Sequence, residues 1–428
     1  MSLFRKIGVA LVLLSLLMVL FPASIAGADD PVSFPDPDLE EVVRDAIGKP
    51  AGDILQSDLQ GLTSLTADSR GIGNLTGLEQ CTDLNYISFA HNEISDISPL
   101  AGLTGLNWVH FHDNRISDIT PLANLVNLTR ISFANNRIDD IAPLADLAGL
   151  TVVDLSDNQI SDLTPLANLQ GLRELALQNN EITDIGPLSG LTDLTMLYFW
   201  RNDVRDISAL EGLTALTDLR CGYCGISDIS PLSSLVNLSN LQLGGNLIAD
   251  IAPVSGLTGL KDLYLWSNRI EDITPLSGLT GLTYLSLWRN KITDISPLSG
   301  LVNLEYLTLA ENRVRDIYPL VQNTGLGEGD AVVLDDNPLS ATLAVEHMAE
   351  LQERGVRVSS THPLAPTPTP TPTIAPVFSP PVVTSTPAAT PSATPVETET
   401  PFNVWVVVGP VLAVVVLGGA LYFWRRGR

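Results

Sequence analysis

Cysteine is scarce in this chain, with only three in 428 residues. Disulfide-stabilised secreted domains carry larger, even sets of cysteines, so this fold must rest on the burial of apolar side chains. Two of the three form Cys221-Gly-Tyr-Cys224, which has the spacing of redox and zinc motifs. No second pair completes a zinc site, and we interpret both cysteines as structural residues.

Basic residues are also few, since 23 Lys and Arg stand against 48 Asp and Glu, giving a formal net charge of -25. Five of the basic residues lie in the two terminal segments, which leaves 18 basic against 48 acidic residues between them. So acidic a surface repels nucleic acid and anionic lipid head groups, and we expect neither as a partner.

Catalytic motifs are missing as well. The sequence contains no nucleophile with a neighbouring base, no glycine-rich phosphate loop and no paired carboxylate site. We therefore expect a protein that binds a partner, is not an enzyme and needs no cofactor.

The first 28 residues have the pattern of a secretory signal peptide. Arg5 and Lys6 precede an uncharged stretch over 7–20, and small residues follow at 26–28. A stretch of about 14 apolar residues is too short to span a bilayer comfortably, and no charged stop-transfer pattern follows it. We expect cleavage near Ala28 and an extracytoplasmic location for the segment that follows.

The C-terminal end predicts a membrane anchor on a stalk. Residues 404–424 carry no charge and, as a helix, would reach about 31 Å, enough to cross a bilayer. Arginines at 425, 426 and 428 mark the cytoplasmic side, so the N-terminus lies outside. We predict a transmembrane helix over 403–424, a cytoplasmic tail over 425–428, and a Pro- and Thr-rich polyproline stalk over 363–402.

Between these ends the sequence repeats every 22 residues with the pattern L-x-x-L-x-L-x-x-N-x-I-x-D-I-x-P-L. Aspartate recurs in all eleven copies from Asp96 to Asp316, and proline follows in ten, with Ala209 as the exception. Asparagine recurs in ten copies, with Cys224 in the remaining place, at 92, 114, 136, 158, 180, 202, 246, 268, 290 and 312. Self-similarity at a fixed period predicts a stack of coils that folds as one cooperative domain.

Each part of the repeat has a physical reading. The alternation in L-x-x-L-x-L predicts a strand with one buried face, and the asparagine predicts a ladder that satisfies buried backbone groups. Aspartate before proline predicts a capped 3₁₀ turn. The aspartates could instead form a calcium array, but capping supplies the hydrogen bonds that closely spaced carboxylates require, so we favour the structural role.

This repeat resembles the leucine-rich repeats of the internalin type, a family of bacterial surface proteins whose units also have 22 residues. The resemblance covers about residues 33–340 and implies an α/β solenoid with a concave parallel sheet and convex 3₁₀ turns. Around repeats over 62–338 we predict an N-terminal helical cap in 29–61 and a C-terminal helical cap in 339–362. Internalins usually continue into an immunoglobulin-like module and this chain does not, so a host-invasion role does not follow.

Aromatic side chains occupy outward strand positions, where Trp and Tyr usually mark binding surfaces. The column after the last leucine reads Trp200, Gly222, Gly244, Trp266, Trp288, which predicts a slot with aromatic walls about 14 Å apart. The predicted ligand-binding residues are Tyr198, Trp200, Arg220, Gln242, Tyr264, Trp266 and Trp288, with a second patch at Tyr86 and Trp108.

Three histidines fall near the second patch. His110 and His112 alternate on one strand and share its outward face, with His91 one coil away and Asp113 adjacent. Such a group could hold a metal ion, but histidines of this kind are more often solvated or ligand contacts, and we predict no metal site.

These features predict a cell-surface receptor or adhesin that recognises an extracellular protein or peptide on its concave face. A glycan-binding module and a passive structural protein of the cell envelope are the alternatives, because aromatic faces also suit sugars.

Overall fold

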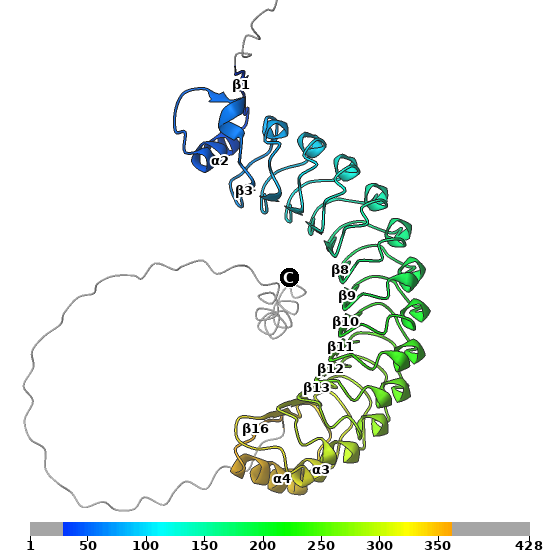
Figure 1. Ribbon diagram of the computed structural model, residues 1–428. Coiled ribbons are helices and arrows are strands. Elements are labelled where there is room, and N and C mark those ends of the chain that lie inside the picture. The colour runs from blue at the N-terminus through cyan, green and yellow to red at the C-terminus, as the bar shows by residue number, and fades with distance from the viewer. Residues whose placement is uncertain (1–28, 362–428) are drawn as a thin grey trace, which may run out of the picture. The chain divides into compact units, whose positions relative to one another are not determined.

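The computed structural model describes residues 29–361, which form a curved stack of coils (Figure 1). Strands line the concave side and 3₁₀ turns the convex side, as the repeat predicts. The predicted signal peptide, stalk, transmembrane helix and cytoplasmic tail lie outside the described residues. Within residues 29–361, no helix has the length and apolarity that a membrane span requires.

Fourteen parallel strands form one sheet in which neighbours in space are neighbours in sequence. Equivalent repeat positions pair with one another, so that Leu219 lies between Leu197 and Leu241. The strands are β3 (Ser64–Thr66), β4 (Tyr86–Ser88), β5 (Trp108–His110), β6 (Arg130–Ser132), β7 (Val152–Asp154), β8 (Glu174–Ala176), β9 (Met196–Tyr198), β10 (Asp218–Arg220), β11 (Asn240–Gln242), β12 (Asp262–Tyr264), β13 (Tyr284–Ser286), β14 (Tyr306–Thr308), β15 (Ala331–Val333) and β16 (Arg357–Ser359).

The core is built from the leucines and isoleucines that recur every 22 residues and point to the inside of each coil. The middle residue of each repeat strand is buried, whereas its neighbours in most strands remain partly accessible on the concave face. Phe89, Phe111 and Phe133 take the last leucine position in three successive coils, and their rings stack at centroid distances of 5.6 and 5.5 Å. A single coil cannot bury these groups alone, so the stack is stabilised between coils.

On the convex side each repeat aspartate accepts a hydrogen bond from the backbone N–H two residues later, as between Ser98 and Asp96 at 2.8 Å. The same bond recurs in all eleven copies, which confirms the predicted capping role. The 3₁₀ turns are η2 (Leu78–Gln80), η3 (Ser98–Leu100), η4 (Thr120–Leu122), η5 (Ala142–Leu144), η6 (Thr164–Leu166), η7 (Gly186–Gly190), η8 (Ser208–Leu210), η9 (Ser230–Ser234), η10 (Ala252–Gly256), η11 (Thr274–Leu276) and η12 (Ser296–Gly300).

The asparagine ladder is present, and each member bonds backward to the preceding coil. Asn202 donates to the carbonyl oxygens of Leu177 at 3.0 Å and Phe199 at 2.8 Å, and accepts from the amide of Ile182 at 2.9 Å. Cys224 performs part of this role, because its thiol donates to the Phe199 carbonyl at 3.3 Å. Ladder side chains therefore satisfy backbone groups that are buried between coils.

A second repeated backbone feature, directly before each ladder position, has no preferred residue type in the sequence. The residue before each ladder position has a positive φ, between 52° and 58° in the non-glycine members from His91 to Glu311, and Gly245 holds the same place with φ 73°. Left-handed backbone at a non-glycine residue is uncommon, and here the side chains are His, Asp, Asn, Arg, Tyr, Ser and Glu. The turn after each strand imposes this conformation whatever the residue type.

Helices occur near both ends of the stack. At the N-terminal side, α2 (Pro37–Ile47) follows a capping Asp36 and ends at left-handed Gly48, beside the antiparallel pair β1 (Pro31–Val32) and β2 (Ile54–Leu55) and the turn η1 (Gln56–Leu59). At the other side, α3 (Tyr318–Gln322) replaces the last 3₁₀ turn, and α4 (Ala341–Glu353) precedes β16. Leu39 and Leu351 bury one face of α2 and of α4 against the core.

Candidate functional site on the concave face

Three tyrosines form a stacked row across the sheet, here called the tyrosine row. Tyr264 and Tyr284 lie with ring centroids 4.7 Å apart, and Tyr284 and Tyr306 with centroids 4.6 Å apart and planes inclined by 9°. All three rings are half-buried, so one part of each remains open to solvent. The row places a continuous line of contacting rings over β12, β13 and β14.

A second set of rings follows the turns just after the strands, here called the indole row. Arg201 lies over the ring of Trp200 at 5.0 Å and over that of Tyr223 at 5.7 Å. Tyr223 contacts Trp266 edge-on with centroids 5.1 Å apart, and Trp266 lies 6.1 Å from Trp288. Arg201 and Tyr223 thus link the indoles that the repeat pattern alone placed in separate coils.

The predicted open slot between Trp200 and Trp266 is wrong. The indole of Trp266 lies directly on Gly244, where a Cβ atom would come within 2.1 Å of the ring. Gly222 is buried against the backbone of Gly244. Gly244 therefore accommodates the indole of Trp266, and no empty slot floor remains there, because a large ring gains more contact by lying flat than by standing as a wall.

The predicted polar residues lie beside these rows, but Arg220 is already paired. Its guanidinium binds both carboxylate oxygens of Asp218, at 3.0 and 2.8 Å, and lies 4.5 Å from the ring centre of Tyr198. Tyr198 donates its hydroxyl hydrogen to Asp218 at 2.9 Å. The charge of Arg220 is therefore neutralised by Asp218 and is not free to bind a ligand.

Gln242 lies between Arg220 and Tyr264 in the strand register. Its neighbour on the same strand, Asn240, has a buried side-chain oxygen without a hydrogen-bond partner among the described residues. A buried acceptor of this kind costs free energy until a donor reaches it.

Burial raises the pKa of Tyr264 to about 12, with the nearby Asp262 carboxylate as the next cause. Burial also raises the pKa of Tyr198 and Tyr284, where Asp218 and Tyr306 respectively add to the effect. These phenols remain protonated at any physiological pH, and the O–H group of Tyr198 already donates to Asp218.

The second predicted patch is also assembled, at the N-terminal part of the sheet. Tyr86 and Trp108 lie with centroids 4.8 Å apart, and Arg130 lies 5.7 Å from the Trp108 ring centre. The histidines adjoin this patch, as alternation on the strand predicts, with His110 and His112 rings 4.5 Å apart. Burial, followed by the neighbouring His112, lowers the pKa of His110 to about 4.

The cysteine pair lies inside the solenoid. Cys221 and Cys224 are both buried, and burial raises the pKa of Cys224 to about 11 and that of Cys221 well above its ordinary value. A buried thiol held in its protonated form is a poor nucleophile and metal ligand. This burial agrees with the structural interpretation of the C-x-x-C spacing.

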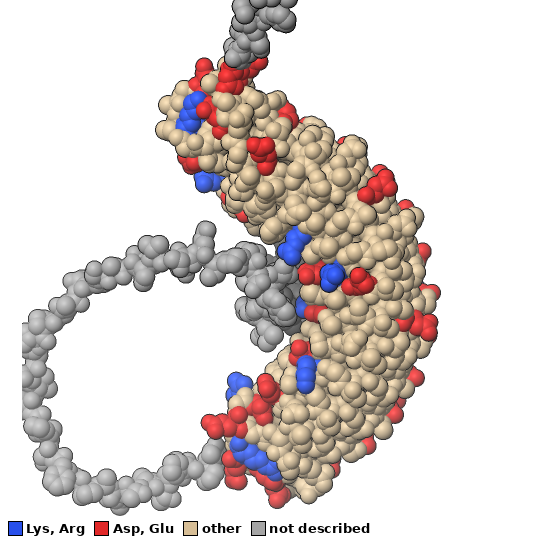
Figure 2. All heavy atoms as spheres, viewed as in Figure 1, with Lys and Arg blue, Asp and Glu red and all other residues tan. Residues whose placement is uncertain are grey.

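Figure 2 shows acidic side chains along the convex edge and a broad flank that is mostly uncharged. The repeat aspartates account for the acidic edge, because they lie on the turns at the outside of the curve. The concave face also carries charge, because Arg201 lies over Trp200 and the pair of Arg220 and Asp218 lies beside Tyr198.

Comparison with known families places the repeats on this fold. A family model described as Leucine Rich repeats (2 copies) matches residues 104–146, 126–168, 148–190, 170–212 and 236–278, and one described as Leucine rich repeat matches 258–314. The plant peptide hormone receptor RGFR1, solved in complex with RGF2, is 18% identical with a TM-score of 0.61, and the match covers 72% of this chain and 53% of the receptor. At that identity the likeness concerns the fold alone.

The ectodomain of the plant membrane receptor kinase GASSHO1/SCHENGEN3 from Arabidopsis thaliana, in complex with CASPARIAN STRIP INTEGRITY FACTOR 2, is 20% identical with a TM-score of 0.56. That match covers 71% of this chain and 42% of the receptor. An internalin, inlF from Listeria monocytogenes, is 32% identical with a TM-score of 0.74, and the match covers 78% of this chain and 98% of the internalin. The chain described here therefore belongs to the internalin-type family of leucine-rich-repeat proteins.

Proposed function

We propose that this protein is an anchored surface receptor or adhesin that binds an extracellular protein or peptide on its concave aromatic face. The observation that carries the proposal is the pair of half-buried aromatic rows on the inside of the curve. Tyr and Trp supply large contact area at low entropic cost and dominate the energetics of protein interfaces.

The polar groups beside the rows suit a peptide. The protonated Tyr264 phenol can donate a hydrogen bond to a peptide C=O group. The Arg220 and Asp218 pair holds Tyr198 in place, which favours a preorganised surface. The two plant receptors matched above were solved with their ligands on a solenoid of the same fold, which makes a peptide or protein ligand the leading hypothesis.

The proposed location rests on the sequence. The signal-peptide pattern over 1–28 would direct residues 29 onward out of the cytoplasm, and the uncharged run over 404–424 would anchor them. A proline-rich stalk of about 35 residues would hold the solenoid up to ~110 Å from the membrane. That distance would leave the concave face accessible to partners outside the cell.

The test presents the purified protein to a peptide array, to a glycan array and to proteins extracted from the native surroundings. Trp266→Ala and Tyr284→Ala each remove one ring, and Gly244→Ala displaces the Trp266 indole without deleting it, because a Cβ at that position overlaps the ring. Each should weaken a peptide or protein ligand roughly 30-fold, since truncation of an interface aromatic costs about 2 kcal/mol.

Val152→Ala is the matched control, because it lies on the same face in β7 but outside both rows. It should leave binding unchanged, and circular dichroism should show native folding for every variant. A glycan ligand that depends on the same rings would favour the glycan-binding alternative. Ligand binding that survives all three ring variants would move the site elsewhere, and absence of any ligand would favour a passive envelope protein.

A further inference from the structure

We propose that His91, His112 and Asp113 form a binding site for one divalent first-row transition-metal ion of the Zn²⁺ class. The site follows the strands that carry Tyr86 and Trp108 and shares no residue with the aromatic rows. It joins two successive coils, since His91 follows β4 while His112 and Asp113 follow β5.

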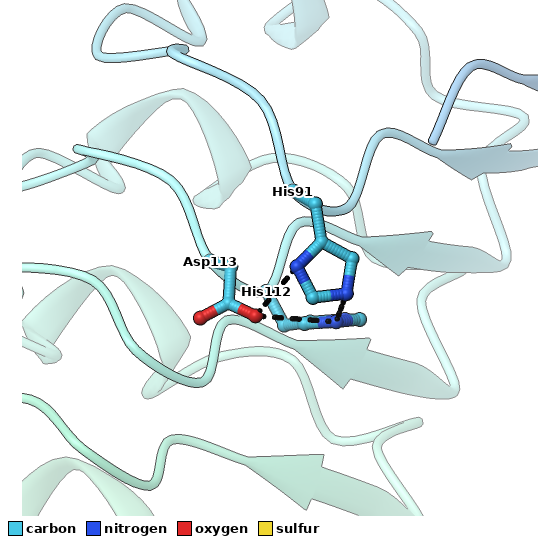
Figure 3. A group of neighbouring side chains, drawn as sticks. All are labelled: His91, His112 and Asp113. Atoms are coloured by element: carbon cyan, nitrogen blue, oxygen red, sulfur yellow. Dashed lines mark hydrogen bonds and ion pairs between the residues drawn. The ribbon is translucent and has the colours of Figure 1, made fainter. Parts of the chain in front are cut away.

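One possible ligand atom of each side chain lies within 4.8 Å of those of the other two (Figure 3). The Nε2 atoms of His91 and His112 lie 2.8 Å apart, and Asp113 Oδ2 lies 2.7 Å from His91 Nδ1 and 3.6 Å from His112 Nε2. Ligand atoms around tetrahedral zinc lie about 3.4 Å from one another, given bonds of ~2.1 Å. The His91 side chain is 53% exposed, so a small rotation of its ring is sufficient to admit the ion.

A chain of hydrogen bonds behind His112 prepares its Nε2 atom for a metal. Ser88 donates its hydroxyl hydrogen to Asp68 at 2.7 Å, which leaves its oxygen to accept from His110 Nδ1 at 3.0 Å. With its proton on Nδ1, neutral His110 accepts at Nε2 from His112 Nδ1, at 2.6 Å. The proton of a neutral His112 is thereby assigned to Nδ1 by the network, and the lone pair on Nε2 points to the site.

This arrangement is what a metal-binding histidine requires, because the second ring nitrogen of such a ligand usually donates to an acceptor that fixes its tautomer and orientation. Asp113 is oriented in the same way. Asn135 donates to its Oδ1 atom, which leaves Oδ2 directed at the two histidines.

The local charge also favours a cation. Within residues 29–361, Asp113 forms ion pairs with His91 and His112 but with no Lys or Arg, and Asp68 forms none. Two uncompensated carboxylates thus lie within one hydrogen-bond network. Imidazole nitrogen with one carboxylate is a donor set for Zn²⁺, Co²⁺, Ni²⁺ or Cu²⁺, whereas Ca²⁺ and Mg²⁺ require oxygen ligands. Three protein ligands leave one position for water or for a donor atom of a partner.

The repeat itself supplies conservative test variants. His112→Ala and Asp113→Asn introduce the residues that the next coil carries at the same positions, Ala134 and Asn135. His91→Asn likewise keeps a residue that tolerates the positive φ found there. Each variant should therefore fold, which melting curves of the metal-free proteins will check against the unmodified chain.

The full-length protein is treated with a chelator, dialysed and titrated calorimetrically with ZnCl₂, and Co²⁺ is used as a spectroscopic probe of coordination geometry. We expect one ion per chain, visible cobalt bands of a low-coordinate site, and a rise in melting temperature with Zn²⁺. His112→Ala and His91→Asn should each weaken zinc binding at least 100-fold, and Asp113→Asn at least tenfold.

Asp157→Asn is the matched control. Asp157 occupies the position of Asp113 two coils later and accepts from Asn179 at 2.8 Å as Asp113 does from Asn135, but Ser156 stands where His112 would be. It should bind zinc like the unmodified chain, as should His347→Gln, which removes a histidine far along the stack. The proposal would be overturned if the unmodified chain failed to bind one zinc ion, or if His112→Ala and His91→Asn bound zinc as tightly as the unmodified chain.

Discussion

A ladder asparagine is the residue on which two coils depend at once. Asn202 donates to two carbonyl oxygens and accepts from the Ile182 amide, and its side chain is buried. Asn202→Ala should lower the free energy of unfolding by about 1 to 3 kcal/mol, because buried backbone groups lose their partners. Urea unfolding measures the change.

Cys224 provides the opposite test. Cys224→Asn would restore a carboxamide at the ladder position, and we expect it to raise the free energy of unfolding by about 0.5 to 2 kcal/mol. Asn237→Ala is the control for both, because Asn237 is exposed and its side chain makes one bond, to the Thr214 carbonyl at 2.8 Å. An Asn202→Ala variant as stable as this control would contradict the role assigned to the ladder.

For single residues, the sequence predicts the face on which a side chain lies better than it predicts the contacts of that side chain. The 22-residue period assigns Leu197 and Asn202 to the interior and Trp266 to the concave face, because one repeat unit determines which way each position points. It does not predict that the Trp266 indole lies on Gly244 and meets Tyr223, since those contacts occur once in the molecule. The hydrogen bonds behind His112 also occur only once in the described residues, so the repeat pattern does not predict them.

Among the elements, five of the convex turns contain an aspartate that responds to acid. Hydrogen bonds from the Thr hydroxyl and backbone of the turn lower the pKa of Asp118, Asp162 and Asp272. Backbone and side-chain hydrogen bonds from Ser lower the pKa of Asp206 and Asp228. A lowered pKa in the folded state means that the ionised turn stabilises the fold.

The stabilisation by these turns should be complete above the ordinary aspartate pKa of 3.8 and should fall as the pH drops below it through the folded-state pKa values. Burial raises the pKa of Asp154, so its contribution has the opposite sign and increases stability as the pH falls toward 3.8. We therefore expect the melting temperature to decline steeply only below about pH 4. Scanning calorimetry from pH 7 to pH 3 measures this profile.

A variant with Asn in place of those five turn aspartates separates the two effects. Asparagine accepts the same backbone hydrogen bond without a charge, so the variant should be less stable than the unmodified chain near pH 7 and should lose the decline that the turns cause below pH 3.8. An unchanged acid profile would show that other carboxylates control the response.

Of the elements themselves, the repeated strands and turns were predictable because each recurs with the same residues, and the helix over 37–47 because an apolar stripe precedes Gly48. The helix α3 was not predicted, since Tyr318 and Pro319 match the pattern of the 3₁₀ turns. The five residues of α3 form an α-helix in the last repeat, which is longer than the others because Tyr306 pairs with Ala331, 25 residues later, in the strand register.

For the whole molecule, both terminal helices lie within the described residues, and the core is one continuous cluster from Phe34 to Val356. A shortened chain of residues 29–362 should therefore be soluble and unfold in a single transition, since each coil is stabilised by its neighbours. Circular dichroism and fluorescence recorded together through a thermal ramp will show coincident curves. Aggregation of the shortened chain, with the longer ectodomain soluble, would show that the C-terminal cap extends further.

The ladder also gives the molecule a direction. Every ladder side chain satisfies the coil before it, and the series ends where Asn337 donates to the Leu309 carbonyl at 2.8 Å and accepts from Val314 at 3.0 Å. A chain emerging from the ribosome is made in the same direction, so each new coil remains incomplete until the next asparagine has been synthesised. The growing edge of the nascent protein is therefore always exposed, and only the arrival of Asn337 and the helix after it closes that edge.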